Sequence, residues 1–410
     1  MNSAKRATYN FYSKKFHHTI FLAGLFILAL IIYEIVIPSG LKPWSYAVGE
    51  KSNYFLDLIG RVSNINQLHV SGNVYLNFGH LAFTYPPAAI FLFFWITIPT
   101  QIILIVFWTI LNAICLFLII TKGITFVNYR KGIEKINLSL WLTIGAILLV
   151  PPIYECFALG QIGLILFYLT FIDYFSESNK LNGVFLGIAA GVKLYPVLFI
   201  FAWISQKKYK ESITAITTAV MLNLLAYFIW PSSSMYFFKK IIFGGAEISH
   251  LLEGIKRLGS SSVISPLIRS PFNLGSENKL ALIGLIATYA LITIFISLKL
   301  HNEGYVLTAF IVIAFTSATC SIVTWDHYFV FIILIPFAWK ESLNHQTFRV
   351  LTCISLAIFV YPWWRFRFWT GTDVLSKTVI YISTNALLFS TFLYIFGSLL
   401  LLINKPTYKN

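Results

Sequence analysis

The chain has 410 residues, of which 58% are hydrophobic and only 11% are charged. Soluble domains carry about 25% charged residues, so this composition excludes an ordinary water-soluble protein and indicates a lipid bilayer as the surroundings. The net charge of +15 is typical of basic residues that orient a membrane protein and meet anionic lipid, so we expect no nucleic acid as a partner.

The N-terminal segment combines a basic start with a long apolar run. Four basic residues among the first seventeen precede an apolar run that ends near Pro38. At about 20 residues this run is too long for a typical signal peptide, so it is predicted to be a retained first transmembrane helix with a cytoplasmic N-terminus. Further apolar runs predict spans at 80–98, 101–121, 137–153, 158–175, 182–205, 211–230, 280–299, 304–323, 327–342, 347–363 and 379–403.

The predicted fold class is therefore all-α: a polytopic integral membrane bundle of about twelve transmembrane helices. We expect one transmembrane domain over residues 1–410. Two polar gaps are long, at 39–79 and 231–279, and counting spans from the N-terminus places both outside the cytoplasm. These outer loops are expected to carry short interfacial helices, one of them over 53–68, where apolar residues recur with helical spacing.

One loop disagrees with this count. The segment at 121–135 is basic, which favours the cytoplasm, yet the count places it outside. The side on which Ala-Leu-Gly-Gln (158–161) lies is therefore left open.

The four cysteines, Cys115, Cys156, Cys320 and Cys353, lie in or at the ends of apolar segments and form no Cys-x-x-Cys pair. Neither a disulfide framework nor a zinc site is expected. The sequence also lacks Walker A, Gly-x-Gly-x-x-Gly and His-Glu-x-x-His patterns, which argues against a nucleotide-driven or zinc-hydrolase mechanism. We expect no metal and no cofactor.

The aspartates are few: Asp57, Asp173, Asp326 and Asp373. Asp173 ends an expected helix beside a polar hinge and is predicted to be a solvated cap. Asp57 lies on the expected 53–68 helix, where it either faces water or takes part in chemistry. Asp326 and His327 start a helix within apolar sequence, either as a cap or ion site or as functional groups, because ionisable residues are costly at membrane depth.

Isolated cations are a second group of candidates. Lys193 lies within an apolar run and precedes Pro196, which loosens helical hydrogen bonding. It either snorkels to the interface or meets a phosphate or carboxylate. Arg257 and Arg269 flank serines in the second long loop, which suits a phosphate or sugar headgroup, although a plain polar loop has the same composition. Arginines among aromatics at 361–373 favour lipid anchoring over nucleic-acid stacking.

Several stretches together resemble glycosyltransferase family 87, polytopic enzymes of the GT-C superfamily that use polyprenyl-phosphate-linked sugars, typically mannose. They are Asp57 followed by GNVY (72–75), FTYPPAAIFLF (83–93), ALGQIGLILFYL (158–169), LNGVFLGIAAGVKLYPVLFI (181–200) and SIVTWDHYFVFIILIP (321–336). The likeness spans roughly residues 40–340. It departs from the family at GSSSV (259–263), which replaces an Asn-Gln-Ser type segment.

The resemblance implies roles for the acids. Asp57 would be the general base that takes the proton of the acceptor hydroxyl, which then attacks the anomeric carbon with inversion. Asp326 and His327 would lie beside the same pocket and bind the sugar or the phosphate.

The resemblance also implies roles for the cations and for two motif residues. Lys193 and either Arg257 or Arg269 would stabilise the charge on the leaving phosphate. Tyr85 and Gln161 would bind substrate as members of the Tyr-Pro-Pro and Gly-Gln motifs.

The sequence thus predicts a membrane glycosyltransferase that moves a hexose, with mannose favoured, from a polyprenyl-phosphate donor to a glycolipid or glycan acceptor. The expected location is a cell membrane, with a bacterial cytoplasmic membrane favoured and the active site on the extracytoplasmic face. The alternative is a flippase or transporter of lipid-linked glycans, which should show paired broken helices or repeated halves, and the sequence shows neither. A glycan polymerase or ligase would share the donor but join larger units.

Overall fold

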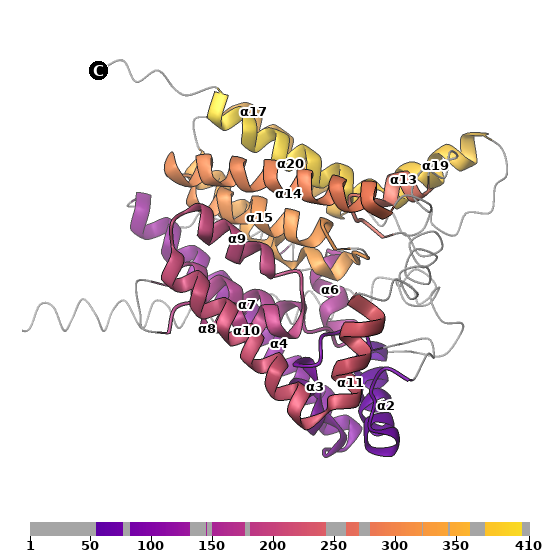
Figure 1. Ribbon diagram of the computed structural model, residues 1–410. Coiled ribbons are helices and arrows are strands. Elements are labelled where there is room, and N and C mark those ends of the chain that lie inside the picture. The colour runs from indigo at the N-terminus through magenta and orange to yellow at the C-terminus, as the bar shows by residue number, and fades with distance from the viewer. Residues whose placement is uncertain are drawn as a thin grey trace, which may run out of the picture.

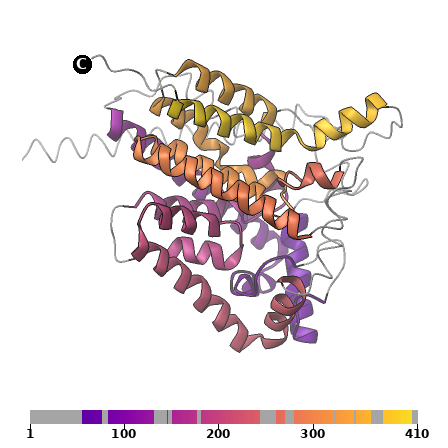
Figure 2. The same ribbon diagram turned by 45° about the horizontal axis from the view of Figure 1, so that its top comes forward.

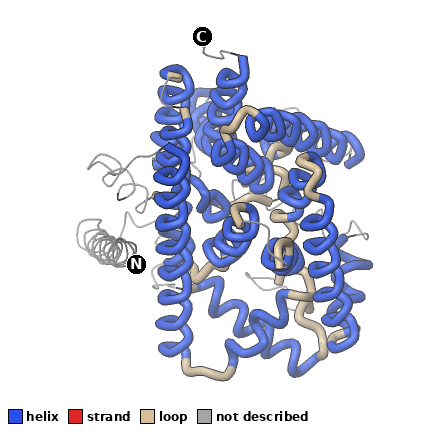
Figure 3. Tube along the Cα trace, turned by 90° about the vertical axis from the view of Figure 1, so that its left-hand side faces the viewer, coloured by secondary structure: helices blue, strands red, loops and turns tan. Residues whose placement is uncertain are grey.

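The structure is a computed structural model, and it describes residues 55–76, 83–131, 145, 150–176, 181–242, 260–269, 279–321, 323–342, 345–360 and 374–403. Within these ranges the regular elements are helices and none is a strand (Figure 3). The predicted all-α class is therefore confirmed for the described part of the chain. The expected first transmembrane helix and the loop at 361–373 lie outside it.

The helices that build the N-terminal part are α2 (Leu56–Ser71), α3 (Ala89–Phe93), η2 (Phe94–Thr97), α4 (Gln101–Lys131), α6 (Pro151–Ala158), α7 (Gly163–Tyr174), α8 (Val184–Val192), α9 (Val197–Ser205), α10 (Tyr209–Ile229), α11 (Pro231–Tyr236) and η3 (Phe237–Ile242). Those of the C-terminal part are α13 (Ser265–Arg269), α14 (Lys279–Asn302), α15 (Val306–Thr319), η4 (Asp326–Leu334), α16 (Ile335–Glu341), α17 (Gln346–Val360), α19 (Val374–Thr384) and α20 (Ala386–Ile403).

The helices gather into two packed groups. In Figures 1 and 2 the orange and yellow helices α14, α15, α17 and α20 form one layer, and the indigo to magenta helices from α2 to α11 lie against it. The segment η4 belongs to the later sequence but packs on α6, α7 and α15, so it joins the two groups. Its position explains how His327 comes to meet residues far earlier in the chain.

Within the described ranges, four helices are long and apolar enough to cross a bilayer, namely Gln101–Phe126, Tyr209–Ile229, Leu280–Asn302 and Ala386–Ile403. Counting α6 and α7, which meet at a bend of 118°, as one span gives a fifth. The four long helices overlap the expected spans 101–121, 211–230, 280–299 and 379–403, whereas the bent pair draws on two expected spans, 137–153 and 158–175. These apolar helices support a membrane protein. The total of about twelve spans stays a prediction.

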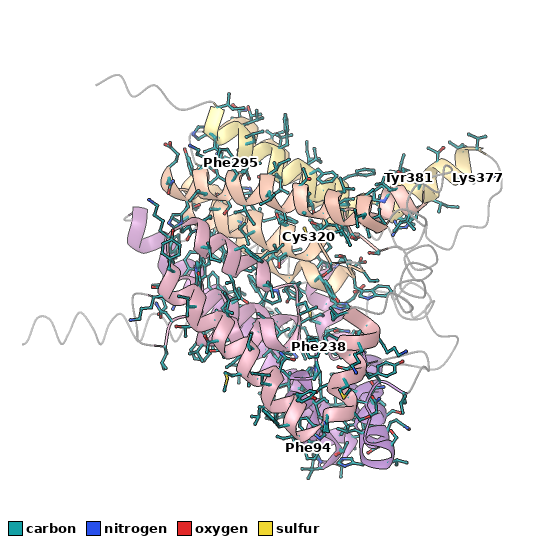
Figure 4. All side chains as sticks on the ribbon, in the orientation of Figure 1. Phe94, Phe238, Phe295, Cys320, Lys377 and Tyr381 are labelled. Atoms are coloured by element: carbon teal, nitrogen blue, oxygen red, sulfur yellow. The ribbon has the colours of Figure 1, made fainter. Side chains whose placement is uncertain are left out.

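The outer faces of these helices are apolar, as lipid contact requires. Large side chains are exposed there, including Ile102 at 75%, Phe228 at 76% and Phe295 at 59%. Phe94, Phe238 and Phe295 lie on the outside of the bundle (Figure 4). An apolar surface of this extent is compatible with the hydrocarbon core of a bilayer, whereas in water it would cause aggregation.

Helices α8 and α10 approach closely along a row of glycines four residues apart. A Cβ atom on Gly187 would lie 2.6 Å from the Ala215 carbonyl oxygen, and one on Gly183 would lie 2.3 Å from the Glu211 carbonyl oxygen. Small residues at this spacing allow two helix backbones to pack directly, as is common in membranes. Helix α8 ends at Val192, and Lys193 is its C-cap residue.

Asp173 caps α8 from inside the protein. Its carboxylate accepts hydrogen bonds from the backbone N–H of Gly183 at 2.9 Å and of Leu186 at 2.8 Å, and the residue is 3% exposed. The prediction of a solvated cap is wrong about solvation. Asp173 is buried, and its carboxylate accepts hydrogen bonds from backbone amides at the start of the next helix.

Candidate active site

Helix α2 begins against the turn that separates α6 from α7. The backbone N–H groups of Phe55 and Leu58 donate to the carbonyl oxygens of Ala158 and Leu159, at 2.6 and 3.2 Å. The amides at the start of one helix thereby satisfy the carbonyls at the end of another. This docking places Asp57, in the first turn of α2, beside Gln161, whose side-chain Nε2 donates to the Asp57 carboxylate.

Gly160 makes this docking possible. Its φ is +68°, a left-handed conformation that favours glycine, and a Cβ atom there would lie 2.7 Å from the Leu58 Cβ and 2.9 Å from the Phe55 Cδ1. Both the backbone conformation and the space next to α2 therefore exclude a side chain.

The substitution Gly160→Ala is expected to lower the midpoint of thermal unfolding of the purified protein. The left-handed backbone alone costs about 1–2 kcal/mol for a residue with a Cβ, and the overlap with Leu58 adds to it. Gly72→Ala, with φ +71° and open space around its Cβ, should lower the midpoint by the backbone part only. Gly284→Ala, in open space on helix α14, should leave it unchanged or raised. Equal midpoints for all three variants would contradict the docking account.

Arg61 lies one helical turn after Asp57, on the same face of α2. Its guanidinium carbon is 5.1 Å from the centre of the Tyr85 ring and 5.9 Å from that of Phe83. Its Nη1 donates to the Asn64 side chain at 3.2 Å. The residue is only 6% exposed, so its positive charge is held inside the protein, where few water molecules shield it.

Lys193 lies where the expected span 182–205 breaks into α8 and α9. Its backbone is extended, with φ −147° and ψ 135°, and Pro196 starts the new helix. Pro196 has no N–H, and the residue before a proline avoids the helical region. Because of this break, Lys193 lies in an extended segment between two helices and not within a continuous apolar helix.

The Lys193 ammonium group is surrounded by three tyrosine rings, which we call the tyrosine cage (Tyr85, Tyr195 and Tyr328). Its Nζ lies 3.9 Å from the centre of the Tyr328 ring, 5.3 Å from Tyr85 and 5.6 Å from Tyr195. Aromatic faces attract cations without neutralising them. Since Arg61 also faces Tyr85, two positive charges flank one ring.

His327 enters the same region from η4. Its Nδ1 lies 3.7 Å from a carboxylate oxygen of Glu155 on α6. Electrostatic interactions link its ring to Lys193 and Arg61, and link Asp57 to the same two cations. One cluster of charged and polar side chains thus draws on six segments: α2, the stretch before α3, α6, the α6–α7 turn, the α8–α9 break and η4.

The cluster contains Asp57, Tyr85, Gln161, Lys193 and His327 from the predicted set. Its other members were not predicted: Arg61, Glu155, Tyr195 and Tyr328. Arg61 carried a signal, since it follows Asp57 by four residues on an expected helix. Glu155 carried another, as an acid in the apolar stretch PPIYECFALGQ.

The other predicted residues lie differently. Asp326 is buried beside His327 at the first position of η4, and the cap position before it is held by Trp325. Arg257 lies outside the described residues. Arg269 donates to the Thr384 carbonyl at 2.8 Å and to the Asn385 side chain at 3.0 Å, so it ties the loop to the junction of α19 and α20.

The serines near Arg269 face inward. The Ser261 N–H donates to the Thr324 carbonyl at 2.9 Å, and the Thr324 N–H donates to the Ser260 hydroxyl at 2.8 Å. Ser260, Ser261 and Ser262 are at most 1% exposed. In this structure they brace the turn that leads into His327.

Burial raises the pKa of the Asp57 carboxyl above its ordinary value, while Arg61, the Gln161 hydrogen bond and Lys193 act in the opposite direction. A carboxylate of this kind can take up a proton, and the two cations beside it can hold an anion. Among the described residues no three His, Cys, Asp or Glu side chains gather as around a metal ion.

The family model of glycosyltransferase family 87 matches residues 83–324, more than half of the chain. The chain belongs to glycosyltransferase family 87. The resemblance seen in its motifs is thereby confirmed. The matched region includes Tyr85, Glu155, Gln161 and Lys193, whereas Asp57 and Arg61 precede it and His327 follows it.

A curated relative of this family 87 chain is the polyprenol-phosphate-mannose-dependent alpha-(1-2)-phosphatidylinositol mannoside mannosyltransferase of Mycobacterium tuberculosis (strain ATCC 25618 / H37Rv). The two are 24% identical over 273 residues, which cover 62% of this chain and 61% of the relative. The chain thus aligns with less than two thirds of that protein.

Proposed function

We propose that this family 87 protein is a membrane glycosyltransferase that moves a hexose, with mannose as first choice, from a polyprenyl-phosphate donor to a glycolipid or glycan acceptor. The observation that carries the proposal is a partly buried carboxylate, Asp57, held by Gln161 next to two cations that flank Tyr85. The name of the curated relative supports the same donor class.

In the proposed reaction, Asp57 takes the proton of an acceptor hydroxyl as its oxygen forms a bond to the anomeric carbon. The bond from that carbon to the phosphate oxygen breaks on the opposite side, and polyprenyl phosphate leaves with the electron pair. A single displacement of this kind inverts the anomeric configuration. Gln161 keeps the carboxylate turned toward the acceptor.

The leaving phosphate gains negative charge as the bond breaks, and we assign its stabilisation to Lys193 and Arg61. Cations fixed in a low-dielectric site act most strongly on charge that develops in the transition state. Arg61 takes the place that the sequence offered to Arg257 or Arg269, because it lies against the same ring as Lys193. The tyrosine cage holds the Lys193 ammonium group without neutralising its charge.

The wider architecture belongs to the same proposal. We propose a GT-C type bundle of about twelve spans in a cell membrane, with the Asp57 cluster on the extracytoplasmic face. Asp326 is proposed to lie near the sugar.

The transporter alternative gains one observation. The broken helices expected of a transporter do occur, at the α6–α7 bend and at Lys193. A lack of broken helices therefore no longer counts against a transporter. Irregular backbone at membrane depth needs a polar lining or protein around it, and both breaks meet the Asp57 cluster. A catalytic site explains this convergence as well as a transport path does.

The acid side of the pH profile reports on Asp57. A base must be ionised to accept a proton, so kcat/KM is expected to fall as the pH falls through the pKa of Asp57. Because burial raises that pKa, the fall should lie above the ordinary aspartate value of 3.8. Initial rates measured across pH, with folding checked at each point, test this. A profile that stays flat down to that value would contradict the assignment.

The donor class is tested by incubating the purified full-length protein in lipid with radiolabelled polyprenyl-phosphate mannose and a glycolipid extract. Label in a new glycolipid supports the proposal. Transfer only from another polyprenyl-phosphate sugar changes the donor and keeps the mechanism. Movement of a lipid-linked glycan across vesicles without any transfer would favour the transporter.

A further inference from the structure

Glu155 and His327 form a pair for which the proposed reaction has no role yet. The His327 Nδ1 lies 3.7 Å from the Glu155 Oε2, with side chains 7% and 16% exposed. The His327 backbone is fixed as well, because the Cys156 sulfur lies 3.8 Å from its carbonyl oxygen and a Cβ on Gly163 would lie 3.0 Å from the same oxygen. The ring therefore has a defined place between α6, α7 and the tyrosine cage.

The carboxylate determines which ring nitrogen carries the proton. An ionised carboxylate only accepts hydrogen bonds, so Glu155 favours the form of His327 with its proton on Nδ1. A second proton on Nε2 would add a third positive charge near Lys193 and Arg61, which both act on this ring. The Nε2 atom is thus left with a lone pair.

We propose that Glu155 is a positioning residue that fixes His327 with its proton on Nδ1, so that Nε2 accepts a hydrogen bond from a hydroxyl group of the donor hexose. A lone pair cannot bind a phosphate oxygen, which is itself an acceptor, and that role remains with Lys193 and Arg61. The sequence left both partners open for His327. The inference rests on the proposed function, because the hydroxyl belongs to its donor.

The distance of 3.7 Å is long for a hydrogen bond, and such contacts often shorten only when substrate binds. In this proposal Glu155 orients His327 as carboxylates orient catalytic or metal-binding histidines in other proteins.

The first test reads the proton directly and needs no substrate. Protein containing ¹⁵N-labelled histidine is examined by NMR, and the His327 signals are those lost in His327→Gln. We expect a protonated Nδ1 and an unprotonated Nε2, and a shift toward the other form in Glu155→Gln, whose amide can donate to Nδ1. A proton on Nε2 in the unaltered protein, or no change in Glu155→Gln, would overturn the inference.

The second test is a double-mutant cycle on kcat/KM for the donor. Glu155→Gln is expected to lower kcat/KM by about tenfold to a hundredfold, the range for a buried hydrogen-bonding group left unsatisfied. In a His327→Gln background the same change should have little further effect. Glu303→Gln, exposed in the turn after α14, is the matched control and should not change the rate. Equal losses in both backgrounds would show that Glu155 does not act through His327.

A panel of donors that each lack one hexose hydroxyl identifies the bound group. One such donor should react equally well with the unaltered protein and with Glu155→Gln. If a deoxy acceptor has this effect instead, the hydroxyl is not the donor's and the proposal fails. Absence of transfer from any donor overturns the proposed function, while the nitrogen spectrum still decides the state of His327.

Discussion

Asp57→Asn is expected to lower kcat of sugar transfer by about 10²- to 10⁴-fold, the range that general base catalysis supplies. The amide has nearly the same size and still accepts the Gln161 hydrogen bond through its oxygen, so the docking of α2 on the 158–161 turn should persist. It cannot take up the acceptor proton. Single-turnover rates with labelled donor, together with donor binding at equilibrium, separate the two effects.

Asp173→Asn is the control for this substitution. Asp173 is also buried, but its carboxylate caps α8, and the amide loses part of that cap. This variant should unfold at a lower temperature and keep the rate and pH profile of the folded protein. An Asp57→Asn protein with normal turnover would rule out Asp57 as the base.

Lys193→Met and Arg61→Met are each expected to lower kcat/KM for the donor by about 10²- to 10³-fold, as for the removal of one group that stabilises transition-state charge. Methionine keeps a long apolar stem for contact with the aromatic rings and removes the charge. Since both cations lie within 5.3 Å of the centre of the Tyr85 ring, the double variant should lose less than the product of the two single losses.

Lys299→Met is the matched control, because Lys299 also lies over an aromatic ring, 5.5 Å from Phe295, on helix α14. It should leave transfer unchanged. Binding of polyprenyl phosphate, the released product, provides a second measurement and should weaken in both site variants. Unchanged rates in Lys193→Met and Arg61→Met would remove the cations from the mechanism.

Local patterns predicted the helices well where a single element decides the outcome. The apolar spacing of 53–68 predicted α2, and the long apolar runs predicted α4, α10, α14 and α20. Asp57 could be selected as the base only through the family resemblance, because the helical spacing alone allows an acid on such a helix simply to face water. Its neighbour Arg61 needed only the rule that residues four apart share a helix face.

Contacts between distant segments could not be predicted in this way. Glu155 and His327 lie 172 positions apart, and only the packing of η4 on α6 joins them. The tyrosine cage takes its residues from three segments. It also depends on the break between α8 and α9, and the local sequence does not predict which side chains surround Lys193 at that break. For Arg269 the sequence left an anion site and a plain polar loop open, and the structure gives this side chain backbone and amide partners.

The most direct test of the account is the anomeric configuration of the product formed from polyprenyl-phosphate mannose of known configuration. The unaltered protein is predicted to yield a labelled glycolipid of the opposite configuration, and Asp57→Asn to yield almost none while still binding donor. A retained configuration would contradict a single displacement assisted by Asp57. No labelled product from any polyprenyl-phosphate sugar would contradict the proposed function itself.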